Sequence, residues 1–237
     1  MKILIAIISY NEEKNIRKTI EDLKQHDIGY DIVLIDNGSS DKTVDIAKSM
    51  GIPVVAHCTN TGASSGVLMS YMLYAYRNGY DILCQFDGDG QHLASELPNI
   101  INPVQNNDAD YVIGSRFLEK KGFQSYAFRR MGIKMFSALD TIITGQKITD
   151  MTSGARAYSR KVMEFFALRY RHEVYDTSQL LLLSHFAGAK IKEVPIIMRE
   201  REHGVSEFHF MAAISFPIKG LISIIGTLLQ RSQIRRG

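Results

Sequence analysis

Short apolar runs alternate along the chain with segments in which apolar residues recur every three to four positions. The runs have the length of strands and the other segments have the period of helices. The pattern therefore predicts an α/β domain with a largely parallel sheet and crossover helices. Strands are expected at residues 3–8, 31–35, 53–56, 82–86, 109–115, 154–158 and 191–198, and helices at about 42–49, 63–78, 129–144 and 178–187.

Two single residues add detail to this pattern. Asn11 is placed to cap a further helix, because Glu12 and Glu13 would then lie at the positive end of its dipole. Pro195 lies inside the last predicted strand. Proline has no N–H to donate to a neighbouring strand, so this strand is expected at an edge of the sheet.

The C-terminal segment, residues 208–237, is expected to form an amphipathic helix beyond a main domain of residues 1–207. Its apolar stretch, 211–229, has polar residues at every fourth position, which on a helix share one narrow face: Ser215, Lys219, Ser223 and Thr227. Pro217 and the charge of Lys219 argue against a membrane span. An interfacial helix with its basic end on anionic lipid fits better, and a core helix or an oligomer contact is the alternative.

Composition excludes several classes of protein. The net charge of +3 is too small to indicate nucleic-acid binding, and two cysteines cannot form a disulfide framework. The apolar N-terminal run, residues 3–8, turns polar at once and is too short for a signal peptide. We therefore expect a cytoplasmic protein.

An acidic turn follows the fourth predicted strand. Asp87 and Asp89 alternate there with glycines, which let the backbone bend tightly. Ligands of open α/β sheets bind beyond the carboxyl ends of strands, and two carboxylates at such a place suit Mg²⁺ or Mn²⁺. Gln91 could add a neutral oxygen ligand, and His92 could lie behind the ligands or near the bound substrate. No Gly-x-Gly-x-x-Gly follows the first strand, which argues against a nicotinamide site.

Six motifs in order resemble a family 2 glycosyltransferase of the GT-A fold, close to the dolichol-phosphate-mannose-synthase-like group. They cover about residues 3 to 206 and are Ile8-Ser-Tyr-Asn-Glu-Glu13, Ile35-Asp-Asn-Gly-Ser-Ser-Asp-Lys-Thr43, Phe86-Asp-Gly-Asp-Gly-Gln-His92, Gly114-Ser-Arg-Phe117, Thr152-Ser-Gly-Ala-Arg-Ala-Tyr158, and Glu193-Val-Pro195 with Arg201-Glu-His-Gly204. The resemblance implies a Rossmann-like, mostly parallel sheet flanked by helices.

The resemblance also implies roles for matching residues. Tyr10, Glu12 and Asp36 would hold the base and ribose of a nucleotide sugar. Asp87, Asp89 and Gln91 would bind the metal and the donor diphosphate. The phosphates of donor or acceptor would face three arginines: Arg116, one of Arg129 or Arg130, and Arg201. Alternatives stay open for several of them: Glu12 could serve only a helix dipole, the adjacent arginines could be solvated, and Arg201 could belong to a surface ion-pair run.

Three departures from the family pattern bear on specificity. Asn37 replaces the second acid of the usual Asp-Asp-Gly-Ser turn, Ala155 replaces an aromatic residue, and Gln179 stands where relatives often carry glutamate. The identity of the nucleotide base, the sugar and the acceptor therefore stays open.

The expected function is inverting transfer of a hexose from a nucleotide-diphosphate sugar to polyprenyl phosphate in cell-surface glycan synthesis. Asp89, Arg201 and Asp150 are the expected catalytic residues, and Asp150 is the best base candidate by family position. An alcohol acceptor would need such a base, whereas a phosphate would not. A lipid-linked saccharide acceptor is the first alternative and a non-catalytic nucleotide-binding subunit the second. The protein is expected at the inner face of the cell membrane, with a homo-oligomer as an open possibility.

Overall fold

A computed structural model describes the chain except residues 27–28, 63–64, 124–126, 171–176, 202–209 and 235–237. The strands are β1 (Ile3–Ser9), β2 (Asp31–Asp36), β3 (Val54–Ala56), β4 (Ile82–Asp87), β5 (Tyr111–Ser115), β6 (Arg156–Ser159) and β7 (Ile191–Pro195). The helices are α1 (Ile16–Gln25), α2 (Thr43–Ser49), α3 (Ser65–Arg77), α4 (Leu97–Gln105), α5 (Ala127–Thr144), α6 (Arg160–Glu164), α7 (Thr177–Phe186) and α8 (Phe210–Ile234). A 3₁₀ turn, η1 (Ala94–Glu96), and a π-helical turn, η2 (Phe165–Arg169), complete them.

The strands form one mostly parallel seven-stranded sheet in the order β3-β2-β1-β4-β6-β5-β7. β6 runs antiparallel to both of its neighbours, and the other pairings are parallel. β7 lies at the edge, which confirms the position predicted from Pro195. In register, Ser9 pairs with Asp36 and Ile8 with Asp87, so the polar ends of β1, β2 and β4 meet at one edge of the sheet.

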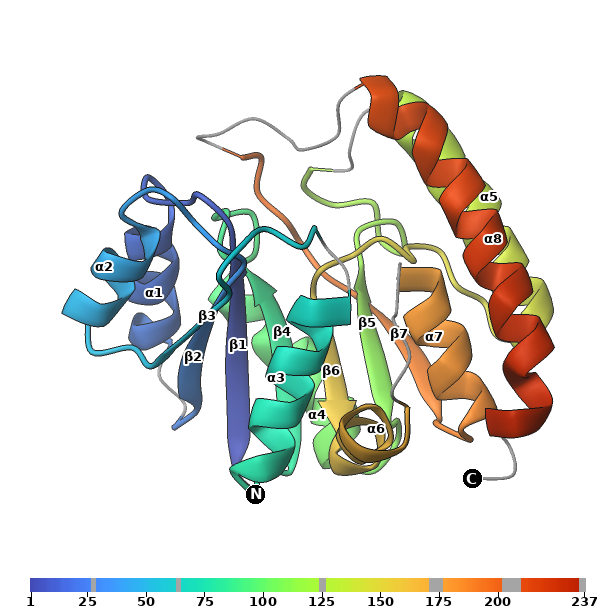
Figure 1. Cartoon of the computed structure of the whole chain (residues 1–237), viewed down its shortest axis with the longest axis horizontal. Coiled ribbons are helices and arrows are strands. Elements are labelled where there is room, and N and C mark those ends of the chain that lie inside the picture. The colour runs from blue at the N-terminus through green and yellow to red at the C-terminus, as the bar shows by residue number, and fades with distance from the viewer. Residues whose placement is uncertain (27–28, 63–64, 124–126, 171–176, 202–209, 235–237) are drawn as a thin grey trace.

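Helices cover both faces of the sheet (Figure 1). Alternate residues of β1 point to opposite faces, as the period of a strand requires: Ile3, Ile5 and Ile7 pack with α1, α2 and α4, whereas Leu4 and Ala6 pack with α3, α6 and α7. The strands are thus buried on both sides, which explains why their sequences are apolar runs and not alternating patterns.

The predicted start of the first helix is wrong. Asn11 has φ 52°, and α1 begins only at Ile16. The side chain of Asn11 accepts a hydrogen bond from the Ser40 N–H at 2.8 Å, and the Glu12 N–H donates to Oγ1 of Thr43 at 2.8 Å. Residues 11 and 12 are therefore tied to the turn after β2 and are not free to enter a helix.

The helices between residues 94 and 105 and between 160 and 164 have no counterpart in the predicted pattern. Pro98 and Pro103 both lie in α4 and obscure its period. Pro98 is nevertheless in the first turn of the helix, where no N–H is needed.

The C-terminal helix α8 packs against α7 and α5 (Figure 1). The contact with α5 is close at Gly220, where an added Cβ would lie 2.6 Å from the Phe136 ring. Ser223 and Thr227, the part of the polar stripe whose side chains are described, face inward and are buried. Within the described chain, no helix has both the length and the apolar character to cross a membrane.

Candidate active site

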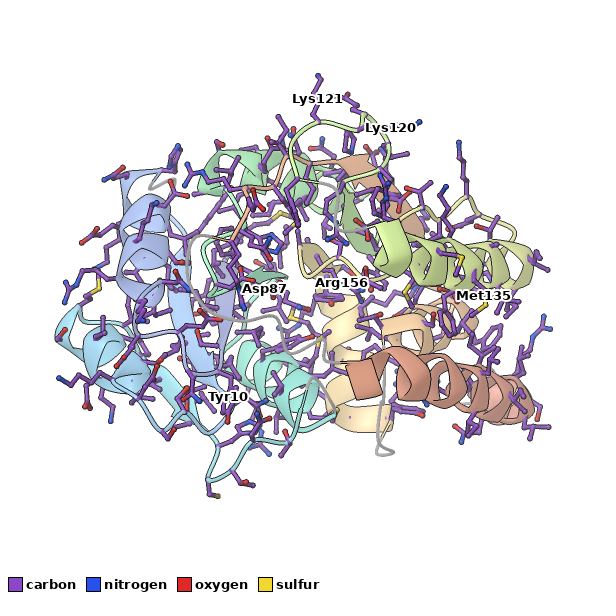
Figure 2. The ribbon with its side chains drawn as sticks, turned by 90° about the horizontal axis from the view of Figure 1, so that it is seen from above. Tyr10, Asp87, Lys120, Lys121, Met135 and Arg156 are labelled. Atoms are coloured by element: carbon purple, nitrogen blue, oxygen red, sulfur yellow. The ribbon has the colours of Figure 1, made fainter. Side chains whose placement is uncertain are left out.

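The site lies at the carboxyl ends of β1, β2 and β4. In the view onto this edge of the sheet, Tyr10 follows β1, and Asp87 and Arg156 lie near the centre of the molecule (Figure 2). Because all three strands are parallel and end at one level, residues from distant parts of the chain converge there.

Asp87 is the last residue of β4 and pairs with His92. Nε2 of His92 lies 3.1 Å from Oδ2 of Asp87, within the turn that the two residues bracket. Burial by itself would lower the pKa of His92, but the Asp87 carboxylate outweighs it and raises that pKa. Burial would likewise raise the pKa of Asp87, and the charge of His92 reverses this and lowers it. The pair therefore favours ionised Asp87.

Gly154 leaves the space that this carboxylate occupies. A Cβ built at Gly154 would lie 2.0 Å from Oδ2 of Asp87, which no real contact allows. Gly88 similarly lies against Ser9, whose Oγ would be 2.2 Å from a Cβ at that position. The absence of a side chain at Gly154 therefore makes room for the Asp87 carboxylate, and its absence at Gly88 makes room for Ser9.

Gly154→Ala is expected to displace the Asp87 carboxylate and to lower the rate of the expected sugar transfer by about a hundredfold. Misplacement of a catalytic group by about 1 Å can cause a loss of this size. Steady-state transfer assays and thermal melting measure this. Gly132→Ala is the matched control, because a Cβ there meets nothing within 4 Å. Equal activity of the two variants would contradict a tight fit at Gly154.

Asp89 is bridged to Glu12 by Arg201. Nη2 of Arg201 lies 2.7 Å from Oε1 of Glu12 and 3.1 Å from Oδ2 of Asp89. Burial is the main cause that raises the pKa of both carboxylates, and the Arg201 charge acts in the opposite direction. Glu12 also accepts a hydrogen bond from Nδ2 of Asn15 at 2.6 Å. The bridge ties the segment after β7 to the acidic turn.

Arg116 and Asp150 form a buried bidentate pair. Nε and Nη2 of Arg116 donate to the two oxygens of Asp150 at 2.6 and 2.7 Å, and the Arg116 N–H adds a third bond at 3.2 Å. Thr152 Oγ1 donates to Asp150 at 3.2 Å. The Asp150 side chain is fully enclosed, with an exposed fraction of 0%.

Glu193, on edge strand β7, holds the loop that carries Asp150. Its carboxylate accepts bonds from the N–H groups of Thr149 and Asp150, the shortest at 2.7 Å, and from the Thr149 hydroxyl at 2.8 Å. The Glu-Val-Pro motif therefore positions Asp150, and through it Arg116.

Arg156 was not among the predicted site residues. It is almost fully buried, and it donates to the carbonyls of Ser153 and Met151 at 2.7 and 2.6 Å and to the Tyr111 hydroxyl. Burial raises the pKa of Asp87, whereas His92 and, more weakly, the Arg156 charge lower it. The arginine of the Thr-Ser-Gly-Ala-Arg motif was the available signal, but nothing local shows that it lies beneath the acidic turn.

The turn after β2 contains Asp36 and Asn37. Oδ2 of Asp36 accepts bonds from the N–H groups of Gly38 and Ser39, while its buried Oδ1 has no hydrogen-bond partner among the described residues. Nδ2 of Asn37 donates to Oδ1 of Asn60 and to the Gly62 carbonyl. A carboxylate could not donate these bonds, so Asn37 has a structural reason to replace the usual acid.

The remaining predicted residues differ in exposure. Tyr10 and Gln91 are half-buried, and the Gln91 side chain donates to the Arg199 carbonyl at 3.3 Å. Arg130 is half-buried in the first turns of α5, whereas the side chain of Arg129 lies outside the described residues. Ala155 is fully buried and does not line an open surface.

A family model described as glycosyl transferase family 2 matches residues 4–166. The chain belongs to this family. It is 30% identical, over 82% of its length and 84% of the relative's, to the UDP-N-acetylglucosamine–dolichyl-phosphate N-acetylglucosaminyltransferase of Methanococcus voltae. It is 29% identical, over 86% and 80%, to the polyprenol monophosphomannose synthase of Mycolicibacterium smegmatis.

The fold of this glycosyltransferase is shared with glucosyl-3-phosphoglycerate synthase from Mycobacterium tuberculosis. The match to the complex of that enzyme with Mn²⁺ and UDP-glucose has a TM-score of 0.69 at 20% identity, over 97% of this chain and 78% of the other. The predicted GT-A fold is thereby confirmed.

The acidic turn fits a divalent cation. Asp87 and Asp89 place hard carboxylate oxygens on one turn, and the absence of a side chain at Gly154 leaves the space that the Asp87 carboxylate occupies. The described residues contain no group of three or more histidines, cysteines and acids arranged around one point. Mg²⁺ and Mn²⁺ suit such a sparse site, because substrate phosphates and water complete their coordination.

Proposed function

We propose that this glycosyltransferase moves a hexose from a nucleotide-diphosphate sugar to polyprenyl phosphate, with inversion, at the cytoplasmic face of the membrane. The names of the two relatives support the acceptor class, since both include a polyprenol or dolichyl phosphate. The solved fold neighbour binds Mn²⁺ and UDP-glucose, which supports a nucleotide-sugar donor and a divalent metal. The biological role that we propose for this reaction is cell-surface glycan synthesis.

The observation that carries the phosphate acceptor is the state of Asp150. Both oxygens of this carboxylate are engaged by Arg116, and none of the side chain is exposed. A general base must reach the proton that it removes, within hydrogen-bond distance or through one water. Enclosed in this way, Asp150 is poorly placed to deprotonate an alcohol. A phosphate acceptor is already anionic at neutral pH and requires no base.

In the proposed reaction, a phosphate oxygen of the acceptor attacks the anomeric carbon as the bond to the donor diphosphate breaks. One direct displacement inverts the configuration at that carbon. When bound by Asp87, Asp89 and Gln91, the divalent cation would neutralise charge on the leaving diphosphate. Arg201, and either Arg129 or Arg130, would supply guanidinium donors for the phosphates of donor or acceptor.

Donor binding is assigned to the residues after β1 and β2. Oδ1 of Asp36, which has no hydrogen-bond partner among the described residues, is available to accept a hydrogen bond from the nucleotide. A ribose hydroxyl or a base N–H could donate this bond. Tyr10 lies half-buried at the end of the neighbouring strand, where its ring can contact a base.

An exposed apolar surface on α5 and α8 supports attachment to the membrane. We call it the α5/α8 face; its members are Met131, Met135, Ile142, Leu221, Ile222, Ile225, Leu228 and Leu229. The exposed fraction reaches 77% for Ile142 and 78% for Leu229. Met135 extends outward from α5 (Figure 2). Exposed apolar residues gathered on two helices that pack together mark contact with a membrane or another protein.

The charges around the α5/α8 face favour the membrane. Lys134 and Arg231 are exposed on these two helices, while Asp140, the sole acid in either helix sequence, is buried. An apolar surface on two helices whose described, exposed charged side chains are basic matches anionic lipid. A homo-oligomer through the same face is the alternative occupant.

Direct assay separates the proposed acceptor from the alternatives. Purified protein with Mn²⁺ and labelled UDP- and GDP-hexoses is given undecaprenyl phosphate or a lipid-linked saccharide. Labelled lipid from undecaprenyl phosphate alone is the expected result. Product only with the saccharide would replace the proposal by the first alternative. No product with any donor, while nucleotide still binds, would favour a non-catalytic subunit.

Asp150→Asn is expected to slow transfer about tenfold or less. The substitution weakens the ion pair with Arg116, but a phosphate acceptor needs no general base that it could remove. Loss of a general base would instead slow transfer about 10²- to 10⁴-fold. The variant is compared with wild type in kcat, donor binding and melting temperature, and in the acid limb of the pH–kcat profile. A loss near 10³-fold with folding and donor binding retained would contradict the phosphate acceptor.

A further inference from the structure

Both acidic side chains of the acidic turn, Asp87 and Asp89, have a basic protein group beside them. Asp87 lies against His92, and Asp89 shares Arg201 with Glu12. The Arg201 bridge is largely shielded from solvent, with side-chain exposed fractions of 23% for Arg201, 10% for Glu12 and 14% for Asp89. The charges at the centre of the site are thus largely compensated by the protein itself.

From this bridge we infer that Arg201 is the resident counter-ion of Asp89, and that the site therefore takes its divalent cation together with a nucleotide diphosphate and not alone. Glu12 is the positioning residue that holds Arg201 at Asp89. The inference rests on the proposed function and extends it to the order in which the site is filled.

Competition for one carboxylate oxygen is the physical basis. A divalent cation that binds Asp89 must displace the guanidinium from Oδ2 or lie beside its positive charge. Either change is unfavourable in a partly buried site, because an arginine that loses its partner without gaining another leaves an unsatisfied charge. A divalent cation added without nucleotide should therefore bind weakly.

A diphosphate removes that cost. It supplies oxygens that complete the coordination of the cation, and its remaining oxygens offer an anionic partner to the displaced Arg201. Arg201 then keeps a charged partner in both states, first Asp89 and afterwards the donor. Glu12 stays beside Arg201 throughout, with Oε1 at 2.7 Å from Nη2 in this structure.

The expected signature is a variant that binds metal better while catalysing worse. Free Mn²⁺ is measured by electron paramagnetic resonance during titration of the full chain, first with Mn²⁺ alone and then with UDP or GDP added. For wild type, we expect weak binding of Mn²⁺ alone, strengthened by the matching nucleotide by about tenfold or more. For Arg201→Gln and Arg201→Met, Mn²⁺ alone should bind about tenfold more tightly, and the gain from nucleotide should shrink.

Arg199→Gln is the matched control, because Arg199 is exposed in the same segment and its side chain forms no described contact with the acidic turn. It should bind Mn²⁺ as wild type does. Melting temperatures identify variants that fold. Unchanged or weaker binding of Mn²⁺ alone by both folded Arg201 variants would overturn the inference. The Mn²⁺-alone measurement needs no sugar transfer, so failure of the proposed function in the acceptor assay is recognised separately.

Discussion

Asp89→Asn is expected to abolish sugar transfer, with a loss of about 10³-fold or more, and to weaken Mn²⁺-dependent nucleotide binding. The substitution keeps the size of the side chain and removes the charge that the proposed cation requires. Asp89 lies in a turn beyond β4, so little core packing is lost and the fold should persist. Transfer is measured with saturating Mn²⁺, and nucleotide binding by thermal shift with and without the metal.

Asp45→Asn controls for the loss of one carboxylate charge. Asp45 is exposed in the first turn of α2 and has no described contact with the acidic turn, so its variant should retain full activity. Near-wild-type turnover by the Asp89 variant would exclude Asp89 from the metal site. A melting temperature far below that of the control would instead show that the variant tests folding and not chemistry.

The second large effect is expected at the α5/α8 face. Replacing Ile222, Ile225 and Leu229 by serine should lower binding to vesicles of anionic lipid by about a hundredfold, at about 1 kcal/mol for each apolar side chain that inserts. All three are exposed in the described structure, so the fold and soluble nucleotide binding should be unaffected. Co-sedimentation with vesicles at increasing salt measures both the apolar and the electrostatic contributions.

Point substitutions are a sharper test of this face than deletion of α8. Ile224 and Thr227 are buried, and Gly220 packs against Phe136, so removal of the helix would uncover the side chains beneath it. Leu168→Ser with Ile197→Ser provides the control, since both residues are exposed apolar side chains outside α5 and α8. Vesicle binding lost equally in control and test variants, or retained in both, would exclude the α5/α8 face as the membrane contact. Concentration-dependent dimerisation that only the triple variant loses would identify the face as an oligomer contact.

The strands could be predicted from the sequence because each depends on residues that are neighbours in the chain. All seven strands were predicted from the sequence, most of them from apolar runs, and Asp87 and Asp89 directly after one of these runs indicated the edge of the sheet where a site was expected. The motif order was sufficient to indicate the family, and Pro195 correctly indicated an edge strand.

What the sequence could not determine was which polar groups neutralise one another. Arg116 and Asp150 are 34 residues apart, and Arg201 and Asp89 are 112 residues apart. Each was recognised separately as a site residue, but their pairing depends on the strand order. That order brings the end of β5 and the segment after β7 to the same edge as β4.

The orientation of α8 was also decided by tertiary structure. A period of four residues shows that Ser223 and Thr227 share a face with each other, but it does not show whether that face meets water or protein. In the folded chain these two residues pack inward while the larger apolar residues Ile222 and Leu229 are exposed. Gly220 allows α8 to approach the Phe136 ring of α5 closely, and Ser223, Ile224 and Thr227 are buried together although they differ in polarity and size. Helix packing, and not polarity, therefore determines which side of α8 faces outward.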